Sequence, residues 1–264
     1  MRYILFSIGS LHIYSYGLMI AIGVICAFFI SDKRANKYGL DSDVVFRLGM
    51  MALVCGMLGA KLLYVIINFK SIIETGDIKG AITEGFVVYG GIIGAILYAL
   101  YFCKKRNIKF LKLADLLVPY LLLVQSIGRW GNFVNREAYG YETNLPWKMG
   151  VYNSQLNDYI YVHPTFLYES ILTFLGFIFL VNLSKNKKFD GQIFYLYMII
   201  YGAIRFCVEG MRTDSLMFAN FRISQLLSLI FVIFFGIIYY IKRKGRRNNE
   251  IGSWHLCLFT VKWI

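Results

Sequence analysis

The chain has 264 residues, of which 58% are hydrophobic, and it contains only three prolines. This composition, with a mean hydropathy of +0.58, excludes an ordinary soluble domain and indicates an integral membrane protein. The net charge of +13 comes from short basic clusters between apolar segments. Because these clusters form no single basic face, we expect them to set membrane topology, and we expect no nucleic-acid partner.

Seven apolar stretches approach the length of a membrane-spanning helix, which is about 20 residues. The first is followed by a basic loop and by no small-residue cleavage site, so it predicts a retained helix rather than a signal peptide. The sequence therefore predicts an all-α integral membrane protein with seven transmembrane helices. In chain order the stretches cover roughly Ile13–Ile30, Val44–Ile67, Phe86–Phe102, Leu113–Ile127, Thr165–Leu183, Ile193–Val208 and Ile223–Ile241.

The distribution of Lys and Arg between the connections predicts how these helices are oriented. The loops at 31–43, 103–112 and 184–191 and the tail from 242 carry 17 basic residues, whereas the N-terminus and the remaining loops carry 8. The positive-inside rule therefore places the N-terminus outside and the C-terminus in the cytoplasm. The aromatic and polar segment Tyr141–Val162, between the fourth and fifth helices, is then expected to form a small outer head.

We expect one polytopic membrane domain over residues 1–247, because the sequence shows no internal repeat and no Pro/Gly-rich linker. Residues 248–264 form a tail of unknown role, and its apolar part, Ile251–Ile264, is too short to span a bilayer. The five cysteines show no C-x-x-C or Cys/His spacing, so we expect no disulfide framework and no metal site. No nucleotide-binding loop is present either, which predicts that no cofactor is needed.

The most polar stretch beside a long apolar segment runs from Gly128 to Gly140 and reads GRWGNFVNREAYG. Arg129 should lie where the fourth helix ends or at membrane depth, where a guanidinium costs about 2.5–3.5 kcal/mol. A snorkelling arginine at a helix end would explain Arg129 taken alone. Snorkelling requires none of the glycines and amides gathered beside it, so we expect Arg129 to have a partner or a chemical function.

Further polar residues interrupt two other apolar helices. Tyr201, Arg205 and Glu209 are spaced four apart on the sixth helix and therefore share one face. They form either a packing ion pair or part of a cationic site facing the bundle interior. Glu169, one turn inside the fifth helix, should be protonated or paired. His163, at the start of that helix, is either a structural hydrogen-bonding residue or a base.

Two tyrosines directly precede glycines on other helices. Tyr16 precedes Gly17 in the first helix, where a phenol near the interface is usually an aromatic-belt anchor. Tyr89 precedes a run of glycines at 90, 91 and 94 in the third helix. Such glycines indicate close helix packing more readily than contact with a ligand.

Arginines, amides and carboxylates thus gather in the outer half of the expected bundle. Two or three guanidinium groups with amide donors suit a phosphate oxyanion, which a guanidinium binds bidentately. At membrane depth on the outer leaflet, such a phosphate is most simply a phospholipid head. The residues of this group are Arg129, Asn132, Asn135, Arg136, Glu137, Glu169, Arg205 and Glu209.

Four motifs resemble those of one family. The stretch GRWGNFVNREAYG resembles the signature of the bacterial prolipoprotein diacylglyceryl transferases. The sequences at His12–Met19 (HIYSYGLM), His163–Glu169 (HPTFLYE) and Tyr201–Arg212 (YGAIRFCVEGMR) resemble further motifs of that family, in the same order. The resemblance covers the chain up to about Arg247 and includes seven helices and an outward N-terminus.

The resemblance implies transfer of a diacylglyceryl group from phosphatidylglycerol to the lipobox cysteine thiol of a prolipoprotein signal peptide. The products are a thioether-linked lipid and glycerol 1-phosphate, in the first step of bacterial lipoprotein maturation. It also implies a multi-pass protein of the bacterial cytoplasmic membrane with its active site toward the outer face. Arg129 and Arg205 would stabilise the charge that builds on the leaving phosphate.

The resemblance also implies roles for individual residues. The residues expected to take part in catalysis are Arg129, Arg205, Glu137, Glu209 and Tyr89. Those expected to bind phosphatidylglycerol are Arg129, Asn132, Gly140, Tyr16, Tyr201, Arg205, His163 and Glu169.

One position departs from the family pattern. Many members carry a histidine before the paired glycines of the third helix, often proposed as the base that activates the thiol, and this chain has Tyr89 there. Tyrosine, with an unperturbed pKa near 10, is a poor base at neutral pH for a thiol of pKa about 8.5. Either Tyr89 only orients the substrate, or Glu137, Glu209 or His163 accepts the proton.

Three other classes of protein are less consistent with the sequence. A secondary transporter of organic anions usually shows inverted repeats or paired broken helices, and none is found. A non-catalytic lipid-binding or scaffold protein would need fewer polar residues at one depth. A metal-dependent phosphatidyl transferase should show an aspartate-rich motif on a helix, which is absent.

Overall fold

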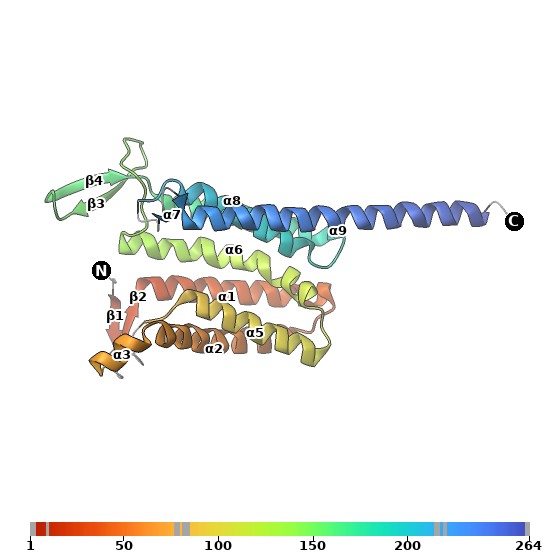
Figure 1. The fold of residues 1–264 in the computed structure, drawn as a ribbon, viewed down its shortest axis with the longest axis horizontal. Coiled ribbons are helices and arrows are strands. Elements are labelled where there is room, and N and C mark those ends of the chain that lie inside the picture. The colour runs from red at the N-terminus through yellow and green to blue at the C-terminus, as the bar shows by residue number, and fades with distance from the viewer. Residues whose placement is uncertain are drawn as a thin grey trace. The chain divides into compact units, whose positions relative to one another are not determined.

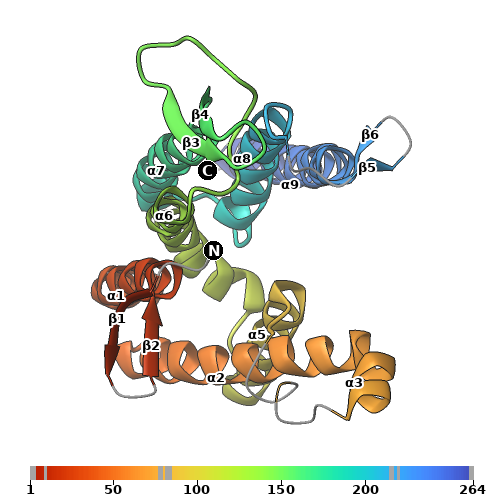
Figure 2. The same cartoon turned by 90° about the vertical axis from the view of Figure 1, so that its left-hand side faces the viewer.

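A computed structural model of the chain describes residues 4–8, 11–76, 80, 85–213, 217–218 and 221–261 (Figure 1). Long helices dominate the described part. They are α1 (Ser15–Ala35), α2 (Ser42–Ile67), α5 (Val88–Arg106), α6 (Phe110–Asn135), α7 (Thr165–Leu183), α8 (Gln192–Glu209) and α9 (Ile223–Val261). The short helix α3 (Phe69–Thr75) follows α2 (Figure 2), and 3-10 turns cover Asn36–Tyr38 and Ser184–Asn186.

Three antiparallel strand pairs lie in the connections. They are β1 (Ile4–Ile8) with β2 (Leu11–Tyr14), β3 (Met149–Asn153) with β4 (Asp158–Val162), and β5 (Met217–Phe218) with β6 (Phe221–Arg222). The prediction of an α-helical integral membrane protein is confirmed, because six described helices are long and apolar enough to cross a membrane. The helix α5 is not among those six, so the seventh span stays a prediction.

The chain divides into two compact units. Unit 1 comprises Met1–Ala27 and Leu117–Ile264, and unit 2 comprises Phe28–Leu116. The expected single domain over residues 1–247 stays a prediction.

In unit 2, α2 and α5 lie side by side through a contact built on glycines. The backbone of Gly59 abuts that of Gly90, and the backbone of Cys55 abuts that of Gly94, so a Cβ on any of these glycines would collide with the opposite helix. Small residues let membrane helices approach this closely. The interpretation of the third-helix glycines as packing residues is therefore confirmed.

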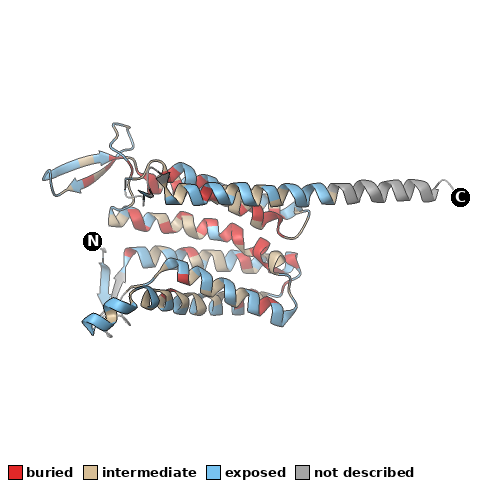
Figure 3. Ribbon diagram, in the orientation of Figure 1, coloured by how far each residue is buried: buried red, intermediate tan, exposed pale blue. Residues whose placement is uncertain are grey.

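In unit 1, α1 and α6 make a similar contact. A Cβ added to Gly131 would lie 2.5 Å from the Tyr16 ring, and one added to Gly23 would lie 3.1 Å from the Cα of Val124. The helix α6 is the most buried of the six apolar helices, with 56% of an apolar 18-residue segment of it buried (Figure 3).

The remaining helices of unit 1 pack in sequence, α7 against α8 and α8 against α9. Gly202 of α8 allows the close packing of α8 on α9, since a Cβ at this position would lie 3.2 Å from the Ser228 carbonyl oxygen. The β3–β4 hairpin occupies the expected head segment, and its buried residues Met149, Val151 and Val162 pack on Phe166 in the first turn of α7. That the hairpin lies outside the membrane stays a prediction.

The last helix is longer than the sequence predicts. We expected it to end near Ile241, but α9 continues to Val261 through the basic cluster and into the tail. Lys, Arg, Asn and Glu are compatible with a helix, and no proline interrupts them, so the helix continues. Residues 262–264 lie outside the described residues, and the role of the tail stays unknown.

Candidate functional site

The signature stretch begins inside a helix. The apolar stretch Leu113–Ile127 covers only part of its helix, because α6 continues for two more turns to Asn135. Gly128 and Gly131 would each weaken an isolated helix by up to about 1 kcal/mol, but here Gly131 admits the close approach of α1. Arg129 and Asn132 therefore share one helix face, and Arg129 Nη1 donates to Asn132 Oδ1 at 3.4 Å.

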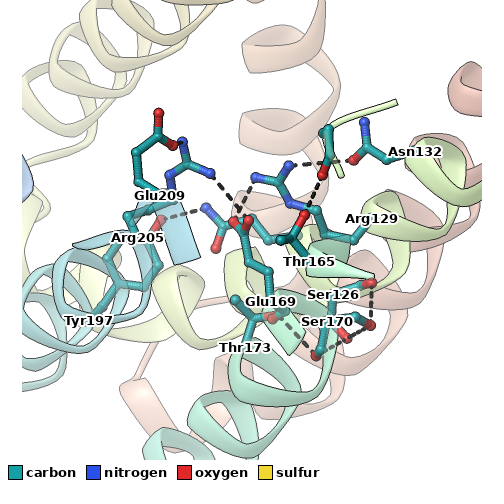
Figure 4. Close-up of polar contacts among 12 residues, drawn as sticks. Ser126, Arg129, Asn132, Thr165, Glu169, Ser170, Thr173, Tyr197, Arg205 and Glu209 are labelled. Atoms are coloured by element: carbon teal, nitrogen blue, oxygen red, sulfur yellow. Dashed lines mark hydrogen bonds and ion pairs between the residues drawn. The ribbon is translucent and has the colours of Figure 1, made fainter. Parts of the chain in front are cut away.

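Two arginines from different helices meet at one carboxylate. Glu169, in the second turn of α7, accepts from Arg129 Nη2 at 2.6 Å and from Arg205 Nη1 at 3.2 Å, through separate oxygens. The other nitrogen of Arg205, Nη2, lies 2.6 Å from Glu209 Oε2 on the same helix. Figure 4 shows these side chains converging from α6, α7 and α8. The prediction that Glu169 is paired is confirmed, and Arg205 and Glu209 are part of a network rather than an isolated pair.

Burial differs between the acids and the bases of this network. The carboxylate side chains are 2% exposed at Glu169 and 4% at Glu209, whereas the arginine side chains are 19% exposed at Arg129 and 17% at Arg205. The formal charges balance, as buried ion pairs require. Because the arginine side chains are more exposed than the carboxylates, an incoming anion would meet the arginines first.

A pair of serines fixes the register of α6 against α7. Ser126 Oγ donates to the Ser170 carbonyl at 2.8 Å, and Ser170 Oγ donates to the Ser126 carbonyl at 2.9 Å (Figure 4). Arg129 lies one turn after the first serine, and Glu169 directly precedes the second. The serine pair therefore places the arginine opposite its carboxylate.

Two tyrosines of α8 stand beside the arginines. Tyr201 lies close to Arg129 and stacks on Tyr197, with ring centroids 6.0 Å apart and planes at 3°. Tyr197 in turn accepts from Gln125 Nε2 at 3.1 Å. The Oε1 atom of Gln125 is buried and has no hydrogen-bond partner among the described residues.

The loop after α6 holds the third carboxylate. Glu137 is exposed and accepts from Asn132 Nδ2 at 3.0 Å and from Asn135 Nδ2 at 3.2 Å. Its neighbours Arg136 and Ala138 have φ of 52° and 57°, a region that non-glycine residues seldom adopt. Thr165 at the start of α7 donates to the Ala138 carbonyl and so helps to hold this backbone conformation.

Gly140 lies where three segments of chain meet. Its N–H donates to the His163 carbonyl at 2.9 Å, and a Cβ on it would lie 2.8 Å from the Met211 carbonyl oxygen. The His163 ring contacts the Tyr168 hydroxyl, with 3.1 Å between Nδ1 and the oxygen. At this junction the glycine fits a close packing role and the histidine a hydrogen-bonding one.

The two tyrosines that precede glycines lie in different units. Tyr16 is at the start of α1 in unit 1, against Gly131, and is 39% exposed. Tyr89 is in the first turn of α5 in unit 2 and is 72% exposed. Its catalytic role stays a prediction.

Several residues that support the site carry no functional signal in the sequence. Arg222 donates to the carbonyl of Glu209, the last residue of α8, and to the Tyr141 hydroxyl at 2.5 Å. Ser15 Oγ donates to Asn135 Oδ1 at 3.1 Å. A serine within an apolar helix and a single arginine in a connection between helices are not distinctive by type or spacing, so only their partners in space identify them. Within the described residues, no group of three His, Cys, Asp or Glu side chains could hold a metal ion.

The fold and the site define a multi-pass helical membrane protein with a buried cluster of arginines and carboxylates where α6, α7 and α8 meet. The chain belongs to the prolipoprotein diacylglyceryl transferase family, whose model matches residues 3–241. The resemblance seen in the motifs is thereby confirmed, and the match ends before the tail.

Named relatives are similar over nearly their whole length, and each carries the name phosphatidylglycerol–prolipoprotein diacylglyceryl transferase. The relative from Finegoldia magna is 45% identical over 244 residues, covering 90% of this chain and 94% of its own. The relative from Clostridioides difficile is 40% identical over 252 residues, covering 94% and 98%. That from Bacillus cereus is 36% identical over 244 residues, covering 90% of each chain.

Proposed function

We propose that this protein transfers the diacylglyceryl group of phosphatidylglycerol to the lipobox cysteine of prolipoproteins, forming a thioether and releasing glycerol 1-phosphate. Family membership and the names of the relatives support this transferase activity. The observation that carries the proposal is one carboxylate, Glu169, held between two guanidinium groups. A bridging carboxylate indicates that a single oxyanion can contact Arg129 and Arg205 together.

In the proposed reaction the lipid phosphate binds the part-exposed faces of these two arginines. The peptide thiolate attacks the glycerol carbon next to the phosphate ester, the C–S bond forms, and the C–O bond to the phosphate breaks. Negative charge then builds on the phosphate oxygens, where Arg129 and Arg205 stabilise it more in the transition state than in the bound lipid. Asn132, Tyr201, Tyr16, Gly140 and His163 are proposed to shape the headgroup site around them.

The thiol proton needs an acceptor, and Glu137 fits this role best among the candidates. Glu209 is 4% exposed and ion-paired with Arg205 at 2.6 Å, so a peptide thiol has little access to it. Glu137 is exposed and is held by two neutral amides, so a peptide thiol can reach it. Tyr89 would then orient a substrate.

We propose seven spans in the bacterial cytoplasmic membrane, with α5 as the seventh. The apolar exposed face of α5 and its antiparallel packing on α2 support this, although glycines and three terminal basic residues lower its hydropathy. The positive-inside rule gives an outer N-terminus and a cytoplasmic C-terminus. The β3–β4 hairpin and the arginine site then lie toward the outer face, where prolipoproteins and outer-leaflet phosphatidylglycerol are available.

The test is a transfer assay with purified protein in detergent, phosphatidylglycerol and a lipobox peptide. We expect a thioether product with the wild type, loss of product with Arg129→Ala, and no product with a peptide in which the lipobox cysteine is replaced by serine. Lack of product from well-folded wild-type protein would overturn the proposal. A product formed equally well by Arg129→Ala would remove the assigned phosphate site.

A further inference from the structure

A groove lies between α2 and α5 in unit 2, and none of the residues assigned above lines it. It has a volume of about 400 Å³, within the range of small-molecule sites. Arg47, Lys105 and Arg106 line it together with Met50, Met51 and Tyr98. Its lining is thus apolar except for three cations.

The cations are at one end of this groove. Arg47 lies in the second turn of α2, and Lys105 and Arg106 are the last two residues of α5. Because α2 and α5 run antiparallel, these helix ends meet. Met50 and Tyr98 lie one to two turns farther from the ends, so the groove changes from cationic to apolar along the helix axis.

The surroundings of the three cations leave them available to an anion. Lys105 Nζ lies 5.9 Å from the centre of the Tyr101 ring, and the Arg106 guanidinium carbon lies 6.0 Å from that of Phe102, so aromatic faces help to orient both. Within the described residues neither has a carboxylate partner. Arg47 is paired with Asp43 at 3.2 Å, but on the surface, where such a pair is weak.

We propose that this groove binds one anionic glycerophospholipid of the surrounding bilayer, separate from the substrate. The phosphate contacts Arg47, Lys105 and Arg106, and one acyl chain lies along Met50, Met51 and Tyr98. The helix α2 is apolar enough to span a membrane, and Met50 is 51% exposed, so this surface faces lipid tails. Its basic end lies at the headgroup level, where each cation strengthens binding to an anionic lipid by about fivefold. Counting only the two cations without a carboxylate partner among the described residues, Lys105 and Arg106, charge complementarity favours an anionic over a zwitterionic lipid by about 20-fold or more.

The inference rests on the membrane assignment and not on the proposed transfer reaction, so the test measures binding. Native mass spectrometry would count lipids bound to the Arg129→Ala protein, in which the substrate site is impaired, with dioleoyl phosphatidylglycerol and with dioleoyl phosphatidylcholine. We expect one tight site for the anionic lipid. The combined variant Arg47→Gln, Lys105→Gln and Arg106→Gln should weaken that site by about 20-fold or more.

Two further variants make the test specific. Lys242→Gln, Arg243→Gln and Lys244→Gln together remove three basic residues from α9, outside the groove, and should leave the tight site intact. Met50→Trp fills the groove without changing charge and should weaken the site even if the triple groove variant does not fold. Equal affinity for both lipids, or equal loss in the α9 variant, would overturn the proposal. So would a dimer that Met50→Trp dissociates, since a second copy would then occupy the groove.

Discussion

Ser126 and Ser170 each donate a hydrogen bond to the backbone carbonyl of the other, which ties α6 to α7 one helical turn from the arginine site. Buried polar bonds between membrane helices contribute about 0.6 kcal/mol on average and up to about 1.7 kcal/mol. Their larger effect here is geometric, because the pair sets the register that brings Arg129 to Glu169.

Replacing both serines by alanine should loosen this register. We expect the thermal midpoint to fall modestly and kcat/KM for transfer to fall by about 10-fold, since a misplaced arginine stabilises the transition state less well. Ser31→Ala is the matched control, because Ser31 Oγ bonds the Phe28 carbonyl within its own helix. A double variant with unchanged kcat/KM would show that the register is set elsewhere.

Glu169→Gln should be severely damaging. It removes the buried charge that pairs with two partly exposed arginines, and breaking a buried pair in this way costs about 3–5 kcal/mol. We expect a clear drop in the thermal midpoint and at least a 100-fold loss of transfer. Glu74→Gln, which breaks an exposed pair of 3.8 Å with Lys70, should change neither by much. A stable and fully active Glu169→Gln protein would contradict the bridging role.

Arg222→Gln should act on the site through Glu209. The Arg222 guanidinium bonds the carbonyl of Glu209 and the Tyr141 hydroxyl, so it holds the end of α8 on which the partner of Arg205 stands. We expect kcat to fall about 10-fold with KM nearly constant, because Arg205 acts mainly on the leaving phosphate. Arg243→Gln, on the exposed part of α9, is the control. A change in KM alone would place Arg222 in substrate binding instead.

Glu137→Gln and Tyr89→Phe separate the two candidate routes for the thiol proton. If Glu137 accepts the proton, the Glu137→Gln substitution should lower kcat by about 100-fold or more. The Tyr89→Phe substitution, which removes only the hydroxyl, should then have a small effect. Single-turnover transfer to a lipobox peptide measures both without interference from product release. A larger loss of kcat in Tyr89→Phe than in Glu137→Gln would show that Tyr89 accepts the thiol proton, despite the high unperturbed pKa of tyrosine.

Gly59→Ala and Gly236→Ala should change stability in opposite directions. A Cβ at Gly59 collides with the Gly90 carbonyl oxygen on α5, whereas a Cβ at Gly236 has nothing within 4 Å. The first should lower the thermal midpoint. The second should raise it slightly, because alanine is favoured over glycine in a helix by up to about 1 kcal/mol. Stabilisation by both would mean that α2 and α5 are not in backbone contact.

Local patterns in the sequence determined much of this protein. Seven apolar stretches predicted the long helices, and the range Thr165–Leu183 agrees with α7 at both ends. The spacing of Arg205 and Glu209 predicted their ion pair, since residues four apart share a helix face. The polar signature was sufficient to identify the family because its residues are contiguous in the chain.

Only the tertiary structure decided which groups meet. Nothing in the sequence predicts that α6 continues through Gly128 and Gly131, because helix propensity opposes it and the packing of Tyr16 on Gly131 outweighs that propensity. Likewise, the chain separates Arg129 from Glu169 by 40 residues and Glu169 from Arg205 by 36. Their contact depends on the register of α6, α7 and α8, which is set by interhelical bonds such as that of Ser126 with Ser170. Sequence periodicity describes one helix at a time, so it does not predict the register between helices.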